Sequence, residues 1–217
     1  MAELDYQHGG KAAHDKLAQA KLKWFGPSCD DVWRVLAEEL PGRFEQSTWL
    51  KSPRVVAEAG PWEVVLDLFR TDKVVFTRIR APYVNADGFR FHVFRRHFFS
   101  GVAEWMGLQD VTVGYPEFDD QFVIRGNDEW KLQRLFAAPR LRALLLAQPS
   151  ITFRVKDDDG RLFGSRFPAG VDQLQFLTGG VIKDLDRLKL LYDLFAETLQ
   201  ELCRMGSAYE DDPGVQL

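Results

Sequence analysis

The 217-residue sequence contains only two cysteines, Cys29 and Cys203, and they lie far apart in the chain. Two cysteines are too few for a disulfide framework or for a zinc site built from cysteine. No stretch approaches about 18 consecutive apolar residues, so no membrane-spanning helix is predicted. The first ten residues, MAELDYQHGG, lack the apolar segment of a secretory signal. We therefore expect a cytoplasmic protein.

The chain also lacks an excess of basic charge. Its net charge is −4 at pH 7, so a chain-wide attraction to nucleic acid is not expected, although a local basic patch stays open. Because 46% of the residues are hydrophobic and 28% are charged, the composition is that of a globular rather than a disordered chain. The length fits one large domain or two small ones.

Motifs that would identify an enzyme or a cofactor site are missing. The sequence contains no HExxH, no G-x-S-x-G, no P-loop and no G-x-G-x-x-G, so we predict no catalytic residue and no cofactor. Asp157–Gly160 resembles the start of a calcium loop, but Pro168 stands where the loop needs glutamate. Gly160 instead indicates a tight hairpin turn.

Apolar periodicity predicts four helices, of which the last is the clearest. We expect them at residues 11–24, Asp31–Glu39 (with Ser28 or Asp30 as its cap), 128–147 (broken at Ala138-Pro139) and from Asp184 to about Arg204. An apolar stripe repeats along the last of them, at Leu188, Leu191, Phe195, Leu199 and Leu202. Such a stripe is typical of a helix that packs on a sheet.

Segments rich in β-branched and aromatic residues predict the strands. They are Arg54–Ala59, Trp62–Phe69, Lys73–Ala81, Phe89–Arg96, Val111–Val113, Gln121–Arg125, Ile151–Lys156, Arg161–Phe167 and Gln173–Leu177. Short turns such as Gly60-Pro61 separate the early strands, which favours antiparallel pairing. We therefore expect an α+β fold, in which a large, mostly antiparallel sheet carries an N-terminal helical segment, a kinked middle helix and a long C-terminal helix packed on the sheet.

The predicted organisation has three parts. Residues 1–27 form a polar, helical N-terminal segment, residues 28–206 form one α+β domain, and residues 207–217 form an acidic tail. The domain itself could consist of two half-domains that meet near residues 108–120.

The segment Phe118–Gly126, with the sequence FDDQFVIRG, precedes the middle helix. Together with the surrounding residues 110–160 it resembles a group of uncharacterised bacterial proteins that carry an FDxxFxI+G-type segment, where + is a basic residue. The resemblance implies a bacterial cytoplasmic origin. No activity is assigned to that group, so it implies no catalytic residues.

Basic residues gather on two of the expected strands. Alternate residues of a strand share one face, so Arg78 and Arg80 lie together, as do Arg90 and His92. If these two strands pair, the four side chains form a basic patch on an exposed sheet face. The patch would be extended by Arg95, Arg96, Phe98, Phe99 and Trp105. Arginine beside aromatic rings suits a protein partner or a small anionic ligand. The alternative is a solvated sheet face whose neighbouring aromatic residues belong to the core.

A second candidate site consists of the carboxylates Glu117, Asp119 and Asp120. Three carboxylates can hold a divalent cation for a metal-assisted hydrolase or transferase. Alternatively, Asp119 accepts hydrogen bonds from backbone N–H groups in a turn. From the sequence we predict a non-enzymatic binding or protein-interaction module that uses the basic face. The metal-assisted enzyme is the alternative, and a purely structural subunit of a larger complex is a third hypothesis.

Overall fold

The protein is described here from a computed structural model. The description covers residues 27–48, 52–96, 110–157, 167–215 and 217. Within these ranges the chain forms a nine-stranded sheet and five helices, and every pair of named strands is antiparallel. The predicted α+β fold with a large antiparallel sheet is confirmed. The helix expected at 11–24 and residues 161–166 of the expected strand Arg161–Phe167 lie outside the described residues.

The first half of the chain forms a helix and then a meander of four strands. These elements are α2 (Cys29–Glu39), β1 (Gly42–Glu45), β2 (Arg54–Ala59), β3 (Trp62–Arg70) and β4 (Val75–Asn85). Ser28 caps α2, because its hydroxyl accepts a hydrogen bond from the backbone N–H of Asp31 at 3.2 Å. The Gly60-Pro61 turn joins β2 to β3, with Gly60 at a φ of 65°.

The second half adds further strands and helices. They are β5 (Phe91–Arg95), α3 (Pro116–Gln121), β6 (Phe122–Gly126), α4 (Glu129–Leu135), α5 (Pro139–Leu146), β7 (Thr152–Lys156), β8 (Val171–Gly179), α6 (Leu185–Met205) and β9 (Ala208–Tyr209). The predicted break of the middle helix at Ala138-Pro139 is confirmed, since α4 ends before it and α5 begins at Pro139.

The strands are ordered β1-β2-β3-β4-β8-β7-β5-β6, and β9 pairs with the end of β4. The assumption that β4 and β5 pair directly is therefore wrong, because β8 and β7 lie between them. A buried carboxylate of β8 holds the chain where it leaves β4. Asp172 accepts a hydrogen bond from Asn85 at 2.6 Å and binds Arg90 through two nitrogens at 3.1 Å. The connection between β4 and β5 is thereby fixed across the end of β8.

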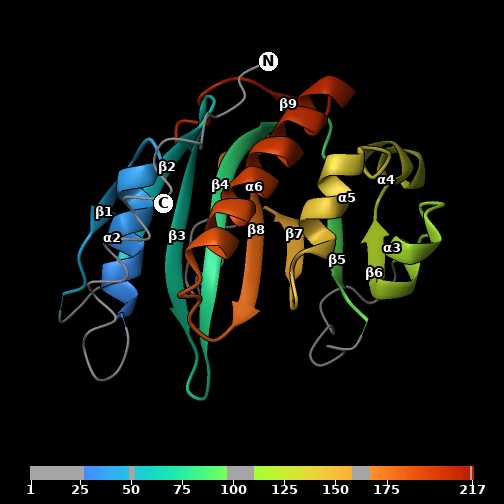
Figure 1. The fold of residues 1–217 in the computed structure, drawn as a ribbon. Coiled ribbons are helices and arrows are strands. Elements are labelled where there is room, and N and C mark those ends of the chain that lie inside the picture. Colours follow the sequence, from blue (N-terminus) through green and yellow to red (C-terminus); the bar gives the residue numbers. More distant parts are fainter. Residues whose placement is uncertain (1–26, 49–51, 97–109, 158–166, 216) are drawn as a thin grey trace.

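The helices α2, α5 and α6 lie over one face of the sheet (Figure 1). The five residues of the predicted apolar stripe on α6 are all completely buried in the core between this helix and the sheet. Asp184 caps the start of α6, and Gly206, at a φ of 77°, ends it in the left-handed conformation. The rings of Phe195 and Phe153 pack edge to face, with centroids 5.6 Å apart, and so join α6 to β7.

The strands differ from the prediction in several places. β4 runs through Pro82 to Asn85 instead of ending at Ala81, β8 is longer than the predicted Gln173–Leu177, and residues 111–113 form no strand. The short strands β1 and β9 were not predicted. A proline lacks the backbone N–H donor of other strand residues, so it commonly marks the end of a strand. Here β4 continues through Pro82. No helix in the described part of the chain is long and apolar enough to cross a membrane.

Replacing Phe195 with alanine should lower the free energy of unfolding by about 3–5 kcal/mol, because the truncation leaves a cavity between α6 and β7. Urea unfolding followed by circular dichroism measures the change. Leu190→Ala on the same helix is the control, since Leu190 is 37% exposed. Equal effects of the two substitutions would show that the stripe is not the core contact.

Candidate functional site

Arg78 and Arg80 lie on the sheet face that turns away from the helices, but they are not exposed. They are 8% and 2% accessible. Two nitrogens of Arg78 lie 2.7 Å from the two carboxylate oxygens of Asp67, and Nη2 of Arg80 lies 2.7 Å from the same carboxylate. The prediction that these arginines present charge on an exposed face is therefore wrong. Alternation placed them on one face correctly, but the face is covered at these positions.

The two basic residues of the next predicted strand are also engaged internally. Arg90 binds Asp172 and lies 3.2 Å from a carboxylate oxygen of Asp157. His92 is buried, and desolvation lowers its pKa to about 3, with further lowering by Arg154 and Arg125. It is therefore uncharged at neutral pH and does not belong to an exposed cationic patch.

The remaining described members of the predicted basic face hold loops together. Arg95 donates to the backbone carbonyls of Leu146 and Gln148. Arg96 donates to the carbonyls of Asp119 and Phe122. Phe98, Phe99 and Trp105 lie outside the described residues. The basic residues that the structure describes thus serve internal contacts, and they do not converge on one open surface.

The second candidate, at α3, is a structural corner. The Asp119 carboxylate accepts hydrogen bonds from the backbone N–H groups of Val113, Gly114 and Tyr115, at 2.9–3.0 Å. The alternative in which Asp119 closes a turn is confirmed. Glu117 and Asp120 are exposed. In the described ranges no group of three or more histidine, cysteine or carboxylate side chains is arranged to hold a metal ion.

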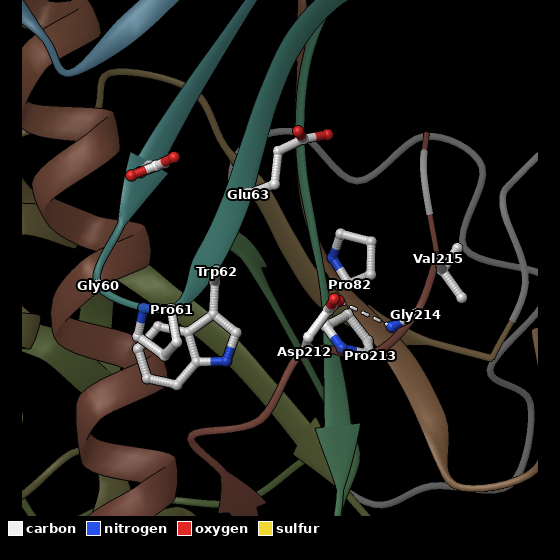
Figure 2. Close-up of a pocket in the computed structure, with 10 residues that line it drawn as sticks. Gly60, Pro61, Trp62, Glu63, Pro82, Asp212, Pro213, Gly214 and Val215 are labelled. Atoms are coloured by element: carbon white, nitrogen blue, oxygen red, sulfur yellow. Dashed lines mark hydrogen bonds between the residues drawn. The ribbon is translucent and has the colours of Figure 1, made fainter.

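A pocket of about 590 Å³ opens at the end of the sheet that carries the β2–β3 turn (Figure 2). Three separate parts of the chain line it: the turn region, the middle of β4 and the C-terminal tail. The described lining residues are Glu58, Gly60, Pro61, Trp62, Glu63, Pro82, Asp212, Pro213, Gly214 and Val215. The sequence gives no local signal for this site, because its lining residues come from three segments that lie far apart in the chain.

The pairing of β9 explains why the tail forms one wall of the pocket. Tyr209 pairs with Val84 at the end of β4, so the following residues turn back over Pro82. Within the tail, Asp212 accepts a hydrogen bond from the backbone N–H of Gly214 at 2.8 Å. Arg54 of β2 donates to the carbonyl oxygen of Leu217, also at 2.8 Å. The β9 pairing and the Arg54–Leu217 contact hold the tail against the sheet, and the Asp212–Gly214 bond turns the chain between them.

The pocket is acidic. The side chains of Glu58, Glu63 and Asp212 line it, and no lysine, arginine or histidine is among its described lining residues. Glu58 and Glu63 are register partners on β2 and β3, which places two like charges directly opposite each other. This arrangement is destabilising by itself. Arg43 offsets it partly, with its Nη2 atom 3.3 Å from the carboxylate of Glu63.

Proline and tryptophan form the apolar part of the wall. Pro61, Pro82 and Pro213 lie around the cavity in Figure 2. Trp62 is 2% exposed, and its indole nitrogen has no hydrogen-bond partner among the described residues. In Figure 2 this nitrogen lies on the side of the ring that faces Asp212 and Pro213. A buried donor without an acceptor costs free energy, which an acceptor on a bound ligand would relieve.

Comparison with known proteins identifies no relative that could assign a function. No protein-family model, curated protein or solved structure matches the chain. The resemblance carried by Phe118–Gly126 therefore stays a prediction.

The low pKa of His92 predicts that acid destabilises the protein. Between about pH 6.5 and pH 3 the unfolded chain binds a proton at this histidine and the folded chain does not, so stability falls as the pH falls. The slope from this group approaches about 1.4 kcal/mol per pH unit. Urea unfolding of the wild type and His92→Gln at several pH values measures it. The variant should lose less stability on acidification, and parallel curves would contradict the assignment.

Proposed function

We propose that this protein is a non-catalytic binding module whose acidic pocket receives a positively charged group. The observation that carries the proposal is the opposed Glu58–Glu63 pair inside a pocket of about 590 Å³. The two carboxylates repel each other and Arg43 offsets this only partly, whereas a cation placed between them would remove their repulsion. Asp212 adds a third carboxylate from the tail.

Size and electrostatics both support this function. Pockets for small ligands commonly have volumes of roughly 300–1,000 Å³, and this one lies within that range. A cation about 4 Å from one carboxylate gains roughly 4 kcal/mol of Coulomb energy at the effective dielectric constant of a protein surface, before desolvation is subtracted. Two or three carboxylates around one cation therefore favour its binding, reduced by the cost of desolvating the charges.

The two functions expected from the sequence have less support. A binding surface on the basic sheet face would need accessible arginines, but Arg78 and Arg80 are buried against Asp67. A metal-assisted enzyme would need free carboxylates at α3, but Asp119 is occupied by three backbone donors. The proposed binding function is thus retained from the sequence, but with a different site and a partner of opposite charge.

Titration with small model compounds, followed by NMR chemical shifts, tests the proposal. We expect the N-acetyl methylamides of arginine or lysine to bind at millimolar concentrations and that of glutamate not to bind. Binding should weaken as salt rises, because the attraction is electrostatic. Replacing Glu58 and Glu63 together with glutamine should weaken binding at least tenfold.

Stability separates a binding role from a structural role of the same residues. Glu58→Gln should stabilise the fold by about 0.2–1 kcal/mol while it weakens binding, because it removes the like-charge pair. The matched control is Asp211→Asn, which changes a charge in the exposed tail outside the described pocket lining. Failure of every cationic compound to bind the wild type would rule the proposal out.

A further inference from the structure

The sheet face that carries the pocket places carboxylates opposite arginines on neighbouring strands. Glu45 of β1 stands opposite Arg54 of β2, and their side chains form two hydrogen bonds, of 2.6 and 3.0 Å. Asp67 of β3 stands opposite Arg78 of β4, with two hydrogen bonds of 2.7 Å. Both pairs have the parallel, two-bond geometry that a carboxylate forms with a guanidinium group.

The pair between these two, on β2 and β3, departs from the pattern. Glu58 stands opposite Glu63, so the position that holds an arginine in the neighbouring pairs holds a second carboxylate. Arg43 reaches Glu63 with a longer contact of 3.3 Å from a side chain that is 62% exposed. No ion pair of Glu58 is found within the described ranges.

We propose that the pocket takes a guanidinium group, supplied by an arginine side chain or a similar ligand, which completes the Glu58–Glu63 pair. This inference rests on the proposed function and specifies the chemical class of its ligand. The incoming group would occupy the place that Arg54 and Arg78 occupy in the adjacent pairs.

Three features favour guanidinium over ammonium. Its planar fork offers five donors and can bind more than one carboxylate, whereas an ammonium group acts as a point charge. It is also more weakly hydrated, so its transfer into a pocket walled by Pro61, Pro82 and Pro213 costs less. The flat group can also lie against these apolar rings while its edge meets the carboxylates.

Trp62 is also among the residues that line the pocket, and its buried indole N–H lacks an acceptor among the described residues. A guanidinium group has no acceptor, so this donor would be matched by a carbonyl oxygen attached to the same ligand. A peptide segment that contains arginine carries both a guanidinium group and a carbonyl oxygen, whereas a free alkylguanidine carries only the guanidinium group.

Arg43 acts as an internal competitor for the same carboxylate. Its Nη2 atom lies 3.3 Å from Glu63, and its Nε atom lies 3.6 Å from Glu45. Exposed ion pairs of this kind are weak. Arg43 also keeps Glu45 as a partner after it leaves Glu63. A ligand can therefore displace Arg43 from Glu63 at low cost.

Methylguanidinium and methylammonium chloride, compared at equal ionic strength by NMR titration of the full chain, test the chemical class. We expect methylguanidinium to bind at least fivefold more tightly, and Glu58→Gln to abolish this preference. Equal affinity, or a preference for methylammonium, would overturn the guanidinium assignment but leave cation binding intact. If neither ion binds, the proposed function fails as well.

Arg43→Gln tests the competitor, because the exposed side chain can be changed without disturbing the core. The variant should bind methylguanidinium up to about fivefold more tightly, the gain expected from an exposed ion pair. Unchanged or weaker binding would show that Arg43 does not compete. Asp211→Asn again provides the control variant.

Comparison of N-acetyl-arginine methylamide with butylguanidinium, two ions of equal charge, identifies the source of the guanidinium group. Tighter binding of the amide, reduced to the level of butylguanidinium by Trp62→Phe, assigns the pocket to arginine in a peptide. Equal or tighter binding of butylguanidinium assigns it to a free guanidine compound. A circular-dichroism spectrum and melting curve of Trp62→Phe show whether the variant is folded.

Discussion

The requirement that charges inside the protein be paired shapes the sheet face opposite the helices. Charge without a partner is costly once water is removed, so a covered strand that carries arginine needs a carboxylate at the matching register position. Asp67 fills this role for Arg78 and Arg80. The strand register thus depends on charge on this face as well as on apolar packing on the other.

The helix-covered face supplies the stability that lets the other face carry so many polar groups. Burial of one large apolar side chain contributes roughly 2 kcal/mol, and the stripe on α6 alone has five of them, all fully buried. A like-charge pair at Glu58 and Glu63 costs at most about 1 kcal/mol. The fold therefore tolerates this pair without difficulty.

The pocket depends on long-range pairing. Glu58 and Glu63 come together because Gly60-Pro61 makes a two-residue turn, which is a local event. Pro82 joins them because β4 pairs with β3, and Asp212 joins them because β9 pairs with β4. Each step brings in residues from farther along the chain, and the cavity exists only when all three are complete.

The sequence by itself determined much of the local structure. The helical spacing of apolar residues identified α2 and α6, and the segments rich in β-branched residues located β2 and β3. Pro139 divided the middle helix into α4 and α5. Alternation also placed Arg78 and Arg80 on one face. The Gly60-Pro61 turn would have paired Glu58 with Glu63, but it offered no reason to connect them with the tail.

Only the tertiary structure decided which strands adjoin and which faces are covered. The insertion of β8 and β7 between β4 and β5 separated Arg80 from His92, although both belong to the same sheet face. The alternation of side chains between the two faces of a strand is a local property, because it follows from the backbone conformation of a few residues. Strand order and burial depend on contacts between distant segments, which local patterns do not encode. For this reason the basic residues were found from the sequence, but their internal partners and the acidic pocket were not.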